Sequence, residues 1–150
     1  MIKEFLTKVL TPTELLMKSY AEAPEISVII DALYNLQLCG SWWVKAARIQ
    51  VVAEEGVLLK SDDDLYKTLP KLSQETPTLI SPKEKLEYVK ACVDTLVDQA
   101  EQFLTENTGL MLPSVERCFT TGLSRVTEAG FCVNVAITHL KVIEEHANRS

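Results

Sequence analysis

The 150-residue chain has little of what nucleotide and metal chemistry usually requires. It contains only five glycines, and none of them forms the GxGxxG or GxxxxGK[ST] spacing of a phosphate-binding loop. Its two histidines, His139 and His146, lie about 10 Å apart along a helix, too far for both to bind one metal ion. Neither has a glutamate three positions earlier, so the di-iron bundle signature is missing. The sequence names no catalytic residue, and we expect no cofactor.

The cysteines are too few and too scattered for a disulfide framework. Of the four, none forms a CxxC pair, and Cys92, Cys118 and Cys132 fall within helical patterns. Such cysteines are typical of buried free thiols in a reducing compartment. The sequence therefore predicts a cytoplasmic protein with reduced cysteines.

Long apolar runs and positive charge are scarce as well. No stretch reaches the ~18 consecutive apolar residues of a membrane helix. Glu4 and Lys8 interrupt the apolar residues at the start, which predicts no signal peptide. The net charge is −6 and no basic stripe occurs, which argues against a protein that binds phosphate backbones. We therefore expect neither a membrane nor a nucleic acid among the partners.

What the sequence does have is helical periodicity with clear helix starts. Thr11-Pro12-Thr13-Glu14 and Ser81-Pro82-Lys83-Glu84 fit capping boxes with proline at the first helical position. Ser61 precedes three aspartates, which suits the positive end of a helix. Gly40-Ser41 offers either a helix break or a kink. The apolar spacing predicts helical segments over residues 2–9, 12–22, 25–38, 42–55, 62–69, 82–106 and 113–146.

The last two segments predict the organisation of the fold. Residues 82–106 and 113–146 are joined by a short link, which indicates an antiparallel helical hairpin. Residues 70–81 contain Pro70 and Pro77 with Ser and Thr, directly before Pro82, and read as a connecting loop. We therefore predict one all-α domain over residues 1–150, a five- or six-helix bundle organised on this hairpin.

The final segment carries apolar residues on two sides. Most of them fall on one stripe, but Phe131, Val135 and Val142 fall opposite, which predicts a helix buried on two faces. Small residues on the first face allow close packing of another helix, or leave a slot for an apolar ligand. The residues that would line this slot are Phe119, Gly122, Ala129 and Phe131.

The adjacent tryptophans point in different directions. Trp42 joins the stripe of Ala46, Ile49 and Ala53, whereas Trp43 points about 100° away. That direction holds Ala47, Gln50 and Glu54 and is expected to face solvent. Tryptophan is enriched at interfaces, so we predict an interface formed by Trp43, Ala47, Gln50 and Glu54. The alternative is that another helix of the same chain covers Trp43.

Three functional hypotheses follow. The first is a non-enzymatic accessory, assembly or regulatory protein that binds another protein or a second copy of itself, with a homodimer as one form. The second is a bundle that holds an apolar small ligand. The third is a metal-dependent nucleotide pyrophosphatase that uses helix carboxylates, for which Glu84, Glu87, Asp94 and Asp98 have only a loosely fitting spacing.

Overall fold

The computed structural model describes residues 2–56, 58–69 and 81–149. These residues contain no strand, so the predicted all-α class is confirmed for the part of the chain that is described. Most of the predicted loop at 70–81 lies outside these residues. The helices are α1 (Ile2–Glu22), α2 (Val28–Glu55), α3 (Asp62–Tyr66), α4 (Pro82–Glu106) and α5 (Pro113–Arg149).

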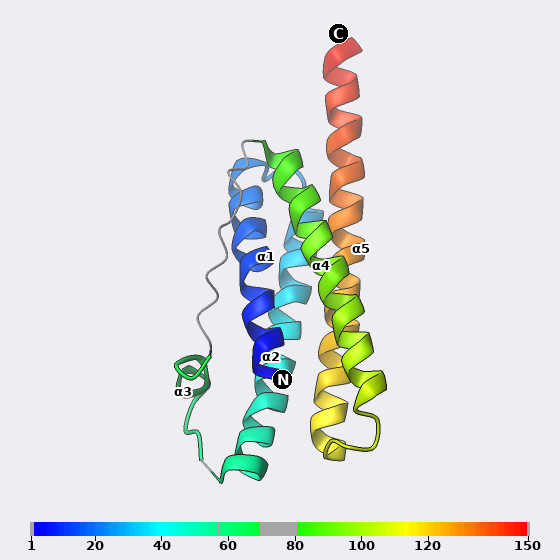
Figure 1. Cartoon of the computed structure of the whole chain (residues 1–150). Helices are drawn as coiled ribbons and strands as arrows, with labels where there is room; N and C mark the ends of the chain where they lie inside the picture. The colour runs from blue at the N-terminus through cyan, green and yellow to red at the C-terminus, as the bar shows by residue number, and fades with distance from the viewer. Residues whose placement is uncertain (1, 57, 70–80, 150) are drawn as a thin grey trace.

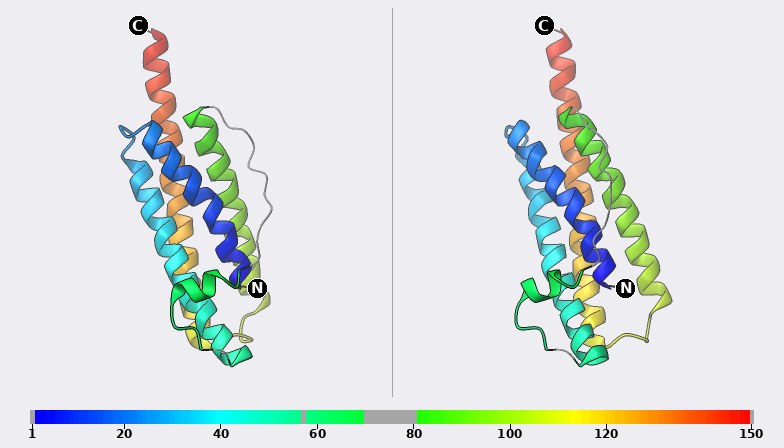
Figure 2. Two further views of the ribbon diagram at one scale, coloured as in Figure 1. Left: turned by 90° about the vertical axis from the view of Figure 1, so that its left-hand side faces the viewer. Right: turned by 60° about the vertical axis from the view of Figure 1, so that its left-hand side comes forward.

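Four long helices lie side by side as a bundle (Figure 1). Both α1 and α5 contact α2 and α4, so each long helix has two neighbours. Figures 1 and 2 show α1 and α5 running in one direction and α2 and α4 in the other, so neighbouring helices are antiparallel. Because α2 and α4 run the same way, the chain must return between them from one end of the bundle to the other. The short α3 lies in this connection, against α2.

The predicted C-terminal hairpin is present, but it organises the bundle only in part. Helix α4 has the predicted bounds, and α5 starts at the predicted Pro113. However, α5 packs more extensively against α2 than against α4. The centre of the bundle is therefore the α2–α5 pair, whose members are far apart in the sequence.

Several predicted helix ends are confirmed by their hydrogen bonds. Ser81 Oγ accepts from the backbone N–H of Glu84 at 3.1 Å, and Ser61 Oγ accepts from that of Asp64 at 3.3 Å. Gly56 ends α2 in the left-handed conformation, with φ at 67°. Only a residue without Cβ adopts this conformation freely.

The predicted helix start at Thr11 is wrong, because α1 continues through Pro12. Proline inside a helix removes one backbone hydrogen bond and costs about 3 kcal/mol. The buried residues Val9, Pro12 and Leu16 lie on one face across this site, so stopping the helix would expose apolar surface on one side of the proline. Packing on α2 and α4 outweighs the local signal.

The possible break at Gly40 is not used either. Helix α2 is continuous where two segments, 25–38 and 42–55, were predicted. Glycine costs a helix only about 1 kcal/mol. The buried Leu36, Cys39 and Trp43 form one apolar face across it, and this burial exceeds the cost of the glycine.

The core contains an aromatic cluster with one ring from each long helix. Its members are Phe5, Trp43, Phe103 and Phe119. The Trp43 and Phe119 rings stack with centroids 5.0 Å apart and an interplanar angle of 11°. Phe5 meets the other three rings edge-on at 5.3–5.7 Å. Such contacts add about 0.5–1.5 kcal/mol per pair beyond the area they bury.

The second predicted buried face of α5 is wrong. Phe131 is 67% exposed, Val135 53% and Val142 44%, so these residues face solvent. The last turns of α5 extend past the ends of the other helices, and residues 141–148 are all exposed (Figure 1). By length and composition α5 is able to cross a membrane, but the central helix of a bundle meets the same criterion.

Candidate functional site

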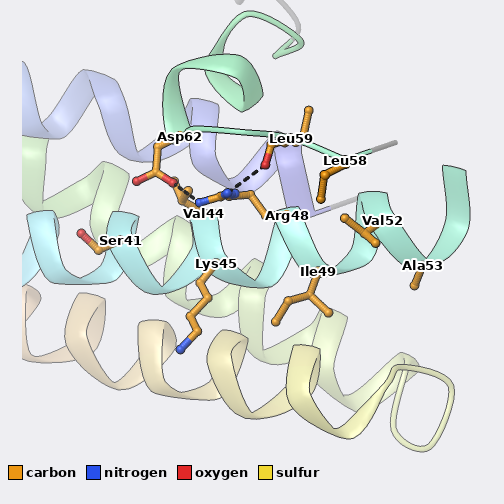
Figure 3. A pocket seen from close by; sticks show the side chains of 10 residues that line it. All are labelled: Ser41, Val44, Lys45, Arg48, Ile49, Val52, Ala53, Leu58, Leu59 and Asp62. Carbon is orange, nitrogen blue, oxygen red and sulfur yellow. Dashed lines mark hydrogen bonds and ion pairs between the residues drawn. The ribbon is translucent and has the colours of Figure 1, made fainter. Parts of the chain in front are cut away.

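An open groove lies on the outer face of α2, next to the segment that follows it. It has a volume of about 660 Å³ and is bordered on one side by residues 58–62 (Figure 3). Its apolar lining includes side chains exposed to solvent, with Val52 at 45% and Leu58 at 77%. The residues that line it are Ser41, Val44, Lys45, Arg48, Ile49, Val52, Ala53, Leu58, Leu59 and Asp62.

Arg48 holds the border of this groove in place. Its Nη1 donates to Asp62 Oδ1 and its Nη2 donates to the backbone oxygen of Leu59, both at 2.9 Å (Figure 3). Two donors of one planar guanidinium therefore reach two points of the 58–62 segment. Because Leu65 of α3 is fully buried, the chain just beyond this segment is anchored as well.

The charges at the groove are two cations and one carboxylate, in a chain whose net charge is −6. Arg48 is balanced by Asp62, and this pair is partly exposed. Lys45 is exposed, with its Nζ 5.3 Å from the centroid of the Trp42 ring. The groove is thus an apolar surface with a local excess of positive charge from Lys45.

Two of the three aspartates that start α3 have side-chain contacts within the fold. Asp62 pairs with Arg48, and Asp64 Oδ2 accepts from the backbone N–H of Lys60 at 3.2 Å. Burial, followed by the charges of Asp62 and Asp63, raises the pKa of Tyr66 above its ordinary value of 10.0. Among the described residues, no group of three or more His, Cys, Asp or Glu side chains is placed to hold a metal ion.

The predicted interface at Trp43 is wrong in its placement. Trp43 is fully buried, and its Nε1 donates to the backbone oxygen of Phe119 at 3.0 Å. Ala47 is also buried, at 1% exposure. The alternative considered above therefore holds, because α5 covers Trp43. The misplaced face follows from the position of α2, which packs on α1 and α5 and so buries a wide arc.

The other two predicted interface residues lie at one end of the bundle. Gln50 Nε2 donates to Glu54 Oε1 at 3.2 Å. Both line a groove of about 320 Å³ beside the turn between α4 and α5, where Leu110 is 79% exposed. Their role as an interface remains a prediction, now without the anchoring tryptophan.

The predicted apolar ligand slot does not form. Phe119, Gly122 and Ala129 are buried, whereas Phe131 is exposed on the opposite side of α5. The space above Gly122 is taken by the Trp43 ring, since a Cβ at position 122 would lie 2.3 Å from Trp43 Cδ1. Gly122 therefore allows α2 to pack closely on α5, which is the alternative to a ligand slot given in the sequence analysis.

The carboxylates named for a pyrophosphatase are on the solvent face of α4. Glu84, Glu87, Asp94 and Asp98 are all exposed. Asp94 pairs with Lys90 Nζ at 2.6 Å, a contact between residues one helical turn apart. His139 and His146 are exposed on α5.

All four cysteines are free thiols. Cys39 and Cys118 are buried, and Cys92 and Cys132 are half-buried. Burial raises the pKa of the Cys39 thiol above its ordinary value of 9.0. Burial also raises the pKa of Cys132, with further contributions from Glu128 and Asp31. Cys39 and Cys132 are therefore poor nucleophiles, because the thiolate is the reactive form.

Sequence reasoning missed the α2 groove. The sequence Val57-Leu58-Leu59 directly follows Gly56, so a short apolar segment was visible. What the sequence did not show is that Arg48 ties this segment back to α2. Comparison of the chain with known protein families, curated proteins and solved structures found no match.

Proposed function

We propose that this protein is non-enzymatic and acts by binding an amphipathic helix of another protein in the α2 groove. The observation that carries the proposal is an apolar groove whose border is held by Arg48 through two hydrogen bonds. Because these hydrogen bonds hold the 58–62 segment in place, the segment does not fold down onto the apolar surface of α2, and the groove stays open. Pre-organisation of this kind lowers the entropic cost of binding.

The dimensions of the groove support a helical partner. Its lining runs along α2 from Ser41 to Ala53, roughly 18 Å at 1.5 Å per residue. This length matches about three turns of a partner helix, which would present apolar residues at i, i+3 or i+4, and i+7. Ile49, Val52 and Leu58 would receive these side chains.

The charge at the groove supports an acidic partner. Lys45 stands at the rim without a carboxylate in ion-pair distance among the described residues. A glutamate or aspartate beside the apolar stripe of the partner helix would pair with it. Such a rim contact contributes mainly to selectivity and association rate.

The free thiols support a reducing compartment, so the proposal includes a cytoplasmic location.

A second candidate function remains on the same groove. A volume of about 660 Å³ also suits a small apolar ligand. The experiment below separates the two.

The test is site-specific photo-crosslinking in cells that express the chain natively. A photo-reactive residue is placed at Val52, and a matched control is placed at Met17, which is 53% exposed on α1. We expect one dominant protein adduct at position 52, with the crosslink in a helix that has apolar i, i+3/i+4 spacing and an acidic flank. A lipid or small-molecule adduct at position 52, or the same adducts at both positions, would overturn the proposal.

A charge-reversal pair makes the test quantitative. Lys45→Glu should weaken binding of the identified partner helix by about tenfold or more, because attraction becomes repulsion. The control is Lys18→Glu on the exposed side of α1, which changes net charge equally. Equal losses for both variants would show that only overall charge matters and would argue against the groove.

A further inference from the structure

The exposed apolar residues of α5 follow a regular pattern. Phe131, Val135 and Val142 lie on its outer face, opposite the residues packed on the bundle. With the exposed Thr138 they alternate at spacings of four, three and four residues, which is the seam pattern of a two-stranded coiled coil. We call these four residues the α5 seam.

A groove beside the seam offers further apolar surface. It has a volume of about 410 Å³ and lies between α4 and α5, with Phe131 at its edge. At Gly130 the two helices approach closely, because a Cβ there would lie 3.3 Å from Val93 Cγ1. Asp94 and Asp98 of α4 also line this groove.

We propose that a second copy of this chain covers the α5 seam, with the two α5 helices antiparallel. The seam is self-complementary in that orientation. A two-fold axis between residues 136 and 137 sets Phe131 against Val142 of the second copy and Val135 against Thr138. The outer layers then pair the larger Phe131 with the smaller Val142, and both copies use the same residues, as an isologous interface requires.

The projecting end of α5 supports the same occupant. Residues 141–148 are exposed and extend past the rest of their own bundle (Figure 1). In the antiparallel pair this end lies along residues 125–132 of the other α5, next to the groove between α4 and α5. Val142 then gains an apolar neighbour, and Lys141 comes to the side that holds Asp94 and Asp98.

The ends of the seam limit the pairing. The next seam position at each end, three residues beyond Phe131 and Val142, is a glutamate: Glu128 and Glu145. Both glutamates are exposed. The antiparallel register brings Glu128 of one copy to Glu145 of the other, where like charges repel. A contact of about two heptads is at the small end of specific interfaces, so we expect dissociation constants on the order of 10–100 μM.

Sedimentation equilibrium over a range up to about 1 mM tests the association at the affinity expected above. The wild-type chain should be a weak dimer. Val135→Glu, at the centre of the seam, should abolish dimerisation, whereas Met17→Glu on α1 should not. Glu145→Gln should tighten the dimer about threefold or more because it removes a repulsion. A monomer at every concentration, or a dimer unaffected by Val135→Glu, would overturn the proposal; circular dichroism confirms that each variant is folded.

Crosslinking tests the orientation. Chains carrying Phe131→Cys and Val142→Cys, each with Cys92→Ser and Cys132→Ser, are mixed and treated with a short bis-maleimide. The antiparallel pair predicts mainly 131–142 crosslinks between the two chains. Predominant 142–142 crosslinks would mean parallel helices and contradict the proposal. Val52→Glu in the α2 groove should leave dimerisation unchanged, so this interface and the proposed function fail or succeed separately.

Discussion

The indole of Trp43 on α2 occupies the space that a side chain at Gly122 of α5 would need. A Cβ at position 122 would lie 2.3 Å from both Cδ1 and Nε1 of the ring. From the same position, Nε1 donates to the backbone oxygen of Phe119 at 3.0 Å. At this contact the two central helices approach each other closely.

The first prediction concerns this glycine. Gly122→Ala should destabilise the protein by about 1–3 kcal/mol in urea unfolding, because the methyl group overlaps the indole ring. The gain in helix propensity, up to about 1 kcal/mol, offsets only part of that.

Gly40→Ala is the matched control for Gly122→Ala. It is also within a helix, but a Cβ there meets nothing within 4 Å. It should stabilise the protein by up to about 1 kcal/mol. If the two alanine variants have equal stability, the Trp43–Gly122 contact does not determine the packing.

The second prediction compares two phenylalanines on one helix. Phe119 is fully buried and stacked on Trp43, so Phe119→Ala should cost about 3–5 kcal/mol. Phe131 is mostly exposed, so Phe131→Ala should change the free energy of unfolding by less than about 0.5 kcal/mol at protein concentrations where the chain is monomeric. Chemical denaturation of both variants measures the difference, and similar losses would place Phe131 in a packed contact.

These residues mark where the sequence was sufficient and where it was not. Apolar spacing and serine caps predicted the all-α class and the bounds of α4, because both signals are local. Helix periodicity also identified apolar residues on two sides of α5. It cannot say which side another helix covers, since that depends on how the crossover orders the helices. Phe131 and Trp43 were therefore assigned to the wrong environments.

The third prediction concerns thiol reactivity. In the folded protein, iodoacetamide should modify Cys92 and Cys132 slowly and leave Cys39 and Cys118 unmodified, since the latter are buried. Burial raises the pKa of Cys92, partly offset by its hydrogen bond with Tyr88, and so lowers its thiolate fraction. In urea all four should react at similar rates. Mass spectrometry without reductant measures the extent of modification in the folded protein and in urea. A disulfide in freshly prepared protein would contradict the predicted reduced state of the cysteines.

The fourth prediction is a loss of stability at alkaline pH. Burial raises the pKa of Cys39 in the folded state above its ordinary value of 9.0. Above that pH the unfolded chain releases the proton while the folded chain keeps it, so the free energy of unfolding falls as pH rises. The fall approaches about 1.4 kcal/mol per pH unit for one group. Below pH 9.0 this contribution is constant.

Comparison with a variant isolates the thiol from other groups that titrate at high pH. The free energy of unfolding of Cys39→Ala should fall less steeply than that of the wild type between about pH 9 and about pH 11. Identical slopes would mean that the Cys39 thiol is accessible to water in the folded protein.

The candidate site was less predictable than the fold. The α2 groove depends on Arg48 reaching Asp62 and the backbone of Leu59, across a turn whose path periodicity does not determine. A surface cation and a carboxylate are common in any sequence, so neither residue type stood out. The apolar residues of the α5 seam were recognisable from their helical spacing, but the same spacing fits a buried face, so they were predicted to lie in the core.

The aromatic cluster at the centre has a consequence for folding. Its four rings come from four helices, and Phe5 and Phe119 are far apart in the sequence. Neither the α1–α2 pair nor the α4–α5 pair alone assembles the cluster, so each half lacks a completed core. Contacts between such distant residues slow folding, because a long loop must close before they form. We expect separately expressed halves to remain largely unstructured until mixed, and the intact chain to unfold in one cooperative transition.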